Sequence, residues 1–537
     1  MGYLNVHVGR KNIPQSEPLT KSQVKNRAGG YVYKIDEMTQ LNRFLILGTM
    51  GGTYYASERE MTRENIDNVS TLLDSHGLEA VQMATEISKA GRAPKNDQAI
   101  LVLAMASVHK DLKVRKAAFA ALPEVCRIGT HLYQFAEFRK QLEGGWSKSM
   151  RHAVASWFND RKAHALAMQV AKYKQRGGWS ARDLLRLSHP KATDAEHDAI
   201  YNWVVSGGEK LGEQAPAFLH ACNEIARIDG KSKGDVQKAL ELIKGHDLPR
   251  EVLPTQLLSK PEVWEALLPH MGATALIRNL GKMTSIGLLK PNSNATIEVA
   301  RKLENPEFVR KGRIHPLNVL VGKMTYDSGH GQKGKLSWDR VGAISSSLED
   351  AFYNAFGAVE PTGKRTIVAI DVSASMSGNW TGMVMGVQGL RPSIAASVMA
   401  MATIRSEGAG CHVLGFDHRV RDLGITRKDS LQEVIRKGGF SGGSTDASLP
   451  MSWAMSHGID CDLFAIYTDN ETWSGRQHPS YSLGEYRKRK GPARFISVGM
   501  TATKHSIADA DDPLSMNIAG FDSATPQIIS AFARGDV

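Results

Sequence analysis

The hydrophobic pattern of the chain changes near residue 360, and this change sets what the chain can fold into. Roughly 65–310 carries apolar residues at helical spacing, with short polar or Gly/Pro breaks between segments and no strand-like alternation. After 360, short apolar runs typical of buried strands alternate with helical segments. Because 537 residues also exceed what one hydrophobic core supports, we predict two domains, 1–360 and 361–537.

The N-terminal part contains a short sequence motif that occurs twice, called here the Gly-Gly-Trp-Ser echo. The string Gly-Gly-Trp-Ser at 144–147 returns at 177–180, an offset of 33 residues, and a basic helical segment follows each copy. Helix-pair repeats of about 33–47 residues stack into curved arrays, so we predict an all-α domain of HEAT-like repeats. Pro123 is expected to end one of its helices. The helices are predicted at 97–106, 114–122, 164–174, 194–205, 235–243 and 261–268.

The C-terminal part has the pattern of a doubly wound α/β domain. Pro392 lies near the first turn of one predicted helix, and Ser430 with Glu433 forms a capping box before another. Alternating strands and helices place helices on both faces of a sheet. The strands are predicted at 364–370, 411–416, 462–467, 493–498 and 517–521.

Oxygen-bearing side chains follow two of these strands and occupy one glycine-rich loop. Asp371, Ser373 and Ser375 come after the first strand, Asp469 follows the strand at 462–467, and Thr445 lies in the loop at 442–446. Ligand sites of such sheets lie at the carboxyl ends of strands, so we expect these residues to meet. Hydroxyl and carboxylate oxygens without His or Cys suit a hard divalent cation, and Mg²⁺ is the ion we predict.

Charge is unevenly distributed along the chain. Residues 361–537 contain 18 of the 67 Lys and Arg and 17 of the 55 Asp and Glu, so they carry +1 of the total +12 and the first 360 residues carry +11. This asymmetry predicts that the helical domain binds a polyanion. Trp179, in the densest basic segment, either stacks on a base or packs in the core. That segment supplies the candidate RNA contacts Lys172, Lys174, Arg176, Arg182, Arg186 and His189.

Cysteine spacing and hydropathy argue against several classes of protein. The four cysteines are far apart and form no Cys-x-x-Cys pair, which disfavours a zinc ribbon and a disulfide framework. No stretch approaches about 18 consecutive apolar residues, and the first residues lack the basic and apolar regions of a secretion signal. We therefore expect a cytoplasmic protein that does not contact a membrane.

The oxygen-bearing residues carry a resemblance to a known family. Asp371-x-Ser373-x-Ser375, Thr445 and Asp469 resemble the metal-ion-dependent adhesion site of von Willebrand A domains. The resemblance implies that the two serines and the threonine bind the metal directly, that the aspartates do so mostly through water, and that one coordination position stays open.

The whole chain resembles the Ro 60-kDa autoantigen family, which joins a helical-repeat TROVE domain to an A domain, and in particular its bacterial members. The strings that carry this resemblance lie at 26–31, 43–48, 172–189, 312–316 and 467–473. It implies a monomeric ring that is closed by the A domain. Y RNA would bind the basic outer surface through Lys172, Arg176 and His189. Single-stranded 3′ ends of misfolded non-coding RNAs would enter a central hole.

The resemblance also implies RNA quality control as part of a ribonucleoprotein, together with a 3′–5′ exoribonuclease such as polynucleotide phosphorylase. We therefore predict an RNA-binding protein that is not an enzyme. A metal-dependent protein-interaction module without specific RNA binding stays open as the alternative. A ribonuclease is disfavoured, because the sequence shows neither a dense carboxylate cluster nor a clear general base.

Overall fold

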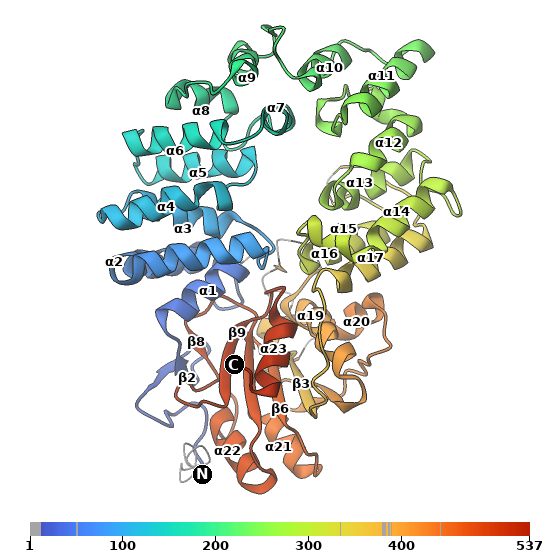
Figure 1. The fold of residues 1–537 in the computed structure, drawn as a ribbon. Helices are drawn as coiled ribbons and strands as arrows, with labels where there is room; N and C mark the ends of the chain where they lie inside the picture. The colour runs from blue at the N-terminus through green and yellow to red at the C-terminus, as the bar shows by residue number, and fades with distance from the viewer. Residues whose placement is uncertain are drawn as a thin grey trace.

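The structure is a computed structural model that describes residues 12–49, 52–332, 334–378, 383–384, 387, 389–440 and 442–537. Helices rise from one side of the sheet domain, pass over the top and return to its other side, so the chain closes into a ring (Figure 1). This arrangement confirms the predicted combination of a helical-repeat ring and a doubly wound α/β domain. None of the described helices combines the length and the apolar character that a membrane-spanning helix requires.

The helices of the arch extend further along the chain than the predicted range of roughly 65–310. Short segment α1 (Glu37–Leu47) precedes them and packs on the first long helix. Their bounds are α2 (Glu58–Ala90), α3 (Asp97–Ser107), α4 (Leu112–Val125), α5 (Gly129–Gln141), α6 (Lys148–Asn159), α7 (Ala163–Lys172), α8 (Ala181–Ser188), α9 (Ala195–Ser206), α10 (Ala217–Ile225), α11 (Lys233–His246), α12 (Pro261–Leu267), α13 (Ala273–Ser285), α14 (Asn294–Glu304), α15 (Pro306–Lys311), α16 (Pro316–Asp327) and α17 (Gly342–Asn354).

The Gly-Gly-Trp-Ser echo marks equivalent positions in successive repeats. Ser147 is the N-cap of α6 and Ser180 is the N-cap of α8, and each side chain accepts a hydrogen bond from the backbone of the following helix. The two tryptophans meet, with the ring centroids of Trp146 and Trp179 6.1 Å apart. One local prediction is wrong: α4 continues through Pro123 to Val125. Pro123 lies in the last turn, where its missing N–H removes one backbone hydrogen bond of the helix.

The sheet domain is built on a six-stranded sheet in the order β5-β4-β3-β6-β7-β9. All neighbouring pairs are parallel except β4 with the short edge strand β5. Ser430 and Glu433 form the predicted capping box at the start of α20. The strands are β3 (Thr366–Asp371), β4 (Cys411–Phe416), β5 (Val420–Arg421), β6 (Leu463–Thr468), β7 (Arg494–Gly499) and β9 (Ser515–Ala519). The helices are α18 (Ala374–Ser377), α19 (Pro392–Glu407), α20 (Leu431–Gly438), α21 (Leu449–Ser456), α22 (Pro479–Lys490) and α23 (Thr525–Arg534).

A second, smaller sheet was not predicted. It pairs β1 (Gln23–Lys25) with β2 (Tyr31–Lys34), and β2 with β8 (His505–Ser506), all antiparallel. The N-terminal segment thus joins the C-terminal sheet domain before the chain enters the arch.

The ring closes where both ends of the arch meet the segment after β9. Arg92, just after α2, donates from Nε to both oxygens of the Asp522 carboxylate, at 3.1 and 3.0 Å, and from NH2 to Oδ2. From the other end of the arch, the buried imidazole of His315 lies 2.7 Å from the carbonyl oxygen of Phe521. The two ends also touch each other, because Asn318 Nδ2 donates to the Pro94 carbonyl at 3.0 Å. The junction therefore links three segments that are far apart in sequence.

Candidate functional site

The five predicted metal-binding residues meet at one edge of the six-stranded sheet. β3 is followed by β4 on one side and, after a crossover, by β6 on its other side. Ligands of doubly wound sheets bind at such a reversal of strand order. Asp371 ends β3 and Asp469 follows β6, while the loop with Thr445 lies against both. None of the five residues is more than 4% exposed.

Backbone hydrogen bonds hold the three loops together. Gly442 N donates to the Val372 carbonyl at 2.8 Å, and Ala374 N donates to the Gly443 carbonyl at the same distance. The contact needs glycine at 442, because a Cβ there would lie 2.3 Å from the Val372 oxygen. The third loop is attached through Trp473 N, which donates to the Thr445 carbonyl at 3.1 Å.

Hydroxyl and carboxylate oxygens converge within this arrangement. The hydroxyl oxygens of Ser373 and Ser375 are 3.2 Å apart, and Thr468 Oγ1 donates to Asp371 Oδ2 at 2.7 Å. Burial raises the pKa of Asp371 to about 6. Burial and the negative charges of Asp371 and Glu471 raise the pKa of Asp469 well above its ordinary value. Carboxylates held close together out of water favour a proton or a bound cation between them.

The donor set fits a hard cation. Among the described residues, no group of three or more His, Cys, Asp and Glu is arranged to hold a metal ion, so a cation here would need the hydroxyls of Ser373, Ser375 and Thr445. Oxygen ligands of this kind suit Mg²⁺ better than Zn²⁺ or copper. The site is therefore chemically consistent with the predicted ion.

The N-terminal segment clamps the loops of this site, which the sequence analysis did not foresee. Gln15 is fully buried, and its Nε2 donates to Asp446 Oδ1 at 2.8 Å while its Oε1 accepts from the Thr472 hydroxyl. Asn26 Nδ2 donates to the Thr472 carbonyl at 2.8 Å. Asp446 adjoins Thr445, and Thr472 lies three residues after Asp469. Two candidate metal loops are thus bridged by side chains from the far end of the chain.

The six predicted RNA contacts occupy one continuous stretch, from the end of α7 to the end of α8, in the upper left part of the arch (Figure 1). Lys172 ends α7 and is half-buried, whereas the other five residues are exposed. Arg176 reaches toward the start of α3, where its NH2 lies 3.7 Å from Asp97 Oδ1. His189 caps α8 in the left-handed conformation. Arg182 and Arg186 lie on α8 four residues apart, so they share one face.

Trp179 has a packing role in this stretch. Its Nε1 donates to Glu137 Oε2 at 2.9 Å, and its ring contacts Trp146. The ring is half-buried and packs against the core. Of the two alternatives for Trp179, the packing interpretation fits these contacts.

A second basic feature was missed by the sequence analysis. A cavity of about 840 Å³ runs along α12, α13 and α16 and reaches Val387 of the sheet domain. Arg250, Arg278 and Lys282 line it together with Trp338, and none of its described lining residues is acidic. Trp338 stacks on Tyr326 at 6.1 Å between centroids. The basic pair at positions 278 and 282, spaced by one helical turn, was the available signal in the sequence.

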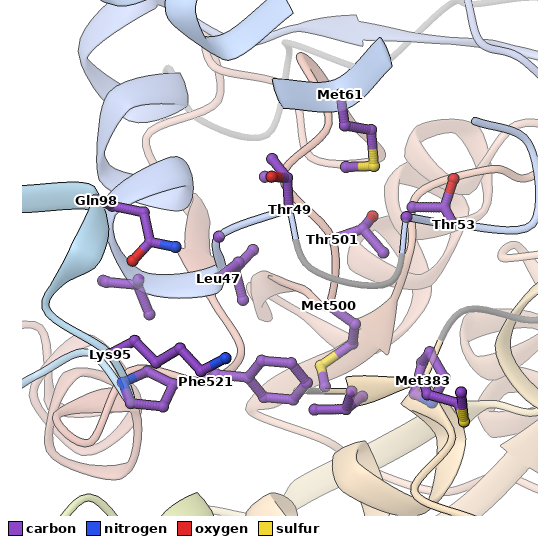
Figure 2. Close-up of a pocket in the computed structure, with 17 residues that line it drawn as sticks. Leu47, Thr49, Thr53, Met61, Lys95, Gln98, Met383, Met500, Thr501 and Phe521 are labelled. Carbon is purple, nitrogen blue, oxygen red and sulfur yellow. The ribbon is translucent and has the colours of Figure 1, made fainter. Parts of the chain in front are cut away.

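A smaller pocket lies where the arch meets the sheet domain (Figure 2). Lys95 extends across it beside Phe521, with Met500 and Met383 on the side of the sheet domain. The pocket has a volume of about 60 Å³, which is too small for a nucleotide.

Comparison with known proteins matches both halves of the chain. The TROVE domain family matches residues 24–246 and 246–325, and the Ro60 vWA domain family matches residues 365–533. A relative from Deinococcus radiodurans, named RNA-binding protein RO60, is 39% identical over 530 residues, which cover 98% of each chain. A relative of the same name from Caenorhabditis elegans is 32% identical over 606 residues, covering 98% of this chain and 92% of the relative.

Solved structures agree with this match. The crystal structure of the Deinococcus radiodurans RO (RSR) protein superposes with a TM-score of 0.69 at 37% sequence identity, over 94% of this chain and 100% of the other. The extent of the match and the order of the two domains confirm the resemblance inferred from the motifs. The chain therefore belongs to the Ro60 family of RNA-binding proteins, which combine a TROVE domain with a von Willebrand A-type domain.

Proposed function

We propose that this protein binds Y RNA on the basic stretch 172–189 and acts in the quality control of misfolded non-coding RNAs as part of a ribonucleoprotein. The observation that carries the proposal is the display of Lys174, Arg176, Arg182, Arg186 and His189 as exposed side chains on one stretch of the arch. Lys and Arg neutralise phosphates, and such contacts provide most of the affinity of proteins for nucleic acids.

The single-stranded 3′ end of a misfolded RNA would pass through the centre of the ring. The cavity along α12, α13 and α16 supports this part of the proposal, because it combines three cationic side chains with a stacked Trp338–Tyr326 pair. Proteins hold single strands through such a combination of phosphate contacts and aromatic surfaces. A monomeric ring in the cytoplasm, handing RNA to a 3′–5′ exoribonuclease such as polynucleotide phosphorylase, completes the proposed role.

The A-type domain would hold one Mg²⁺ ion in this scheme. Ser373, Ser375 and Thr445 would offer hydroxyl ligands, and Asp371 and Asp469 would balance its charge mostly through bound water. A bound cation supplies an open coordination position that an acidic group of a partner can fill. The residues of this chain shape the three loops, and we assign the site a docking or structural role rather than catalysis.

Charge reversal tests the RNA surface. Replacing Lys172 and Arg176 with Glu should weaken binding of a structured Y-type RNA and reduce the magnitude of the slope of log affinity against log salt by about 1.4–1.8, since two phosphate contacts are lost. The matched control reverses Lys488 and Arg489, which are exposed at the end of α22 and change the net charge equally. Equal loss of affinity in both variants, measured by gel shift, would show that only net charge matters.

The same assay separates the competing functions. Labelled RNA with a 3′ tail that is retained intact supports an RNA-binding role, and cleavage that depends on Mg²⁺ indicates a ribonuclease. Absence of any binding indicates a metal-dependent protein-interaction module. For the metal, titration with Mn²⁺ followed by electron paramagnetic resonance should show one binding site, which Asp371→Ala should abolish. The matched control is Asp422→Ala, which removes an exposed carboxylate of the same domain and should leave the site intact.

A further inference from the structure

A cavity of about 440 Å³ opens between α7, α8, α9 and α10, beside the proposed RNA surface. Two of the six candidate RNA contacts, Lys174 and Arg182, line this cavity, although they lie in different elements. Its volume is in the range of sites that enclose a small molecule. The cavity therefore adds a concave feature to a surface that the sequence presents only as a row of charges.

The charged side chains that line the cavity are basic. Lys174 and Arg182 are exposed, and within the described part of the chain no ion pair engages either of them. None of the described residues that line the cavity is acidic. A pocket with two cations and no carboxylate selects an anionic group, such as a phosphate.

The interior is suited to a flat, largely apolar group. Val170, Val204 and Val252 line it together with Trp203, whose Nε1 donates to Asn223 Oδ1 at 3.0 Å. Asn223 in turn donates to the Gly208 carbonyl at 3.0 Å, so the wall is fixed by its own hydrogen bonds.

Part of the wall is bare backbone. Gly207 and Gly208 have φ values of +75° and +95°, and a Cβ at Gly207 would meet no atom within 4 Å. Glycine is favoured at such φ values and lets a ligand approach the main chain closely.

We propose that this cavity receives one unstacked ribonucleotide of the bound RNA, with its phosphate between Lys174 and Arg182 and its base in the interior beside Trp203. The inference rests on the proposed RNA-binding function and deepens it. A base leaves a helix only at a cost in free energy, so the cavity favours RNAs with a bulged or unpaired nucleotide at the matching position.

Photocrosslinking tests the proposal on the full chain. Structured RNA carrying 4-thiouridine at one unpaired position at a time should crosslink, at one position, to a peptide containing Trp203 or Asn223. Ala226 lines the cavity and is exposed, so Ala226→Phe fills the space from outside the core and should reduce that crosslink at least tenfold. Ala226→Ser is the matched control and should keep it. RNA that binds with unchanged affinity but crosslinks elsewhere, or is unaffected by Ala226→Phe, overturns the proposal while the RNA-binding function stands.

A second measurement decides the case without relying on intact RNA or on one variant. Titration of the native protein with uridine or adenosine 5′-monophosphate, followed by ligand-observed NMR, should show binding at least tenfold tighter than that of inorganic phosphate. Equal binding of phosphate would mean that the base contributes nothing, and no binding of either ligand would reject the cavity as a nucleotide site. Nucleotide binding without any binding of RNA would support the cavity and contradict the proposed function.

Discussion

Removing the Asp522 carboxylate should loosen the junction at which the ring closes. Its side chain is 2% exposed and accepts hydrogen bonds from both Nε and NH2 of Arg92, whose side chain is 28% exposed. Truncating one partner of a buried ion pair costs about 3–5 kcal/mol, because the remaining charge is left unpaired. Water can reach part of the Arg92 side chain, so we expect Asp522→Ala to cost about 3 kcal/mol, the low end of that range.

Hydrogen exchange at the junction measures this effect locally. Ser523 N donates to the Arg92 carbonyl at 3.2 Å, and its amide exchanges when this contact opens. A loss of about 3 kcal/mol corresponds to exchange on the order of 100-fold faster. The matched control is Glu124→Ala, which breaks the ion pair with Lys89 in the last turn of α2. The side chain of Lys89 is 64% exposed and that of Glu124 is 44% exposed. Exposed pairs contribute at most about 1 kcal/mol, so the control should change exchange less than tenfold. Wild-type exchange at Ser523 in Asp522→Ala would refute the reasoning.

Three further predictions concern the junction, the arch and the metal loops. Burial lowers the pKa of His315 to about 4, so the unfolded state binds more protons between pH 6.5 and 4. The free energy of unfolding should therefore fall as the pH drops through this window. In His315→Gln, urea unfolding at a series of pH values should show a smaller fall, and a fall equal to that of the wild type would contradict this. Ser180→Ala removes half of a capping box and should destabilise α8 by about 1 kcal/mol, seen as faster amide exchange there and nowhere else. Gly442→Ala forces a Cβ to within 2.3 Å of the Val372 oxygen and should weaken Mn²⁺ binding with the arch intact, whereas unaltered affinity would show that this loop is not part of the site.

Periodicity predicted most of the regular elements, because each depends on residues near one another in sequence. The helix at 97–106 is α3 within one residue, and the strand at 411–416 is β4. The capping box at Ser430 was also predictable, since Ser430 and Glu433 lie within four residues of sequence. The end of this helix was predicted too early, at the residue before Pro123, because proline disfavours the interior of a helix. In the structure Pro123 lies in the last turn of α4.

The candidate site was predicted in part, and the missing part has a physical reason. Its oxygen-bearing side chains lie at strand ends, where topology alone brings them together. The clamp by Gln15 and Asn26 was not predictable in this way, because it joins side chains to loops more than 400 residues away. Strands β1 and β8 are three and two residues long, too short for any periodic signal. The basic cavity along α13 was missed for the related reason that its walls come from several repeats.

The clamp connects the proposed cation to the ring. The N-terminal segment that holds the loops of Thr445 and Asp469 continues through β2 and α1 into α2, which ends two residues before the junction residue Arg92. If a cation binds more tightly when the N-terminal segment is docked on these loops, then the bound cation also stabilises the docked segment. The two effects have the same free energy, because the coupling between two binding events is reciprocal. A metal site without catalytic work would thereby still serve RNA binding, since it would help hold one end of the arch on the sheet domain.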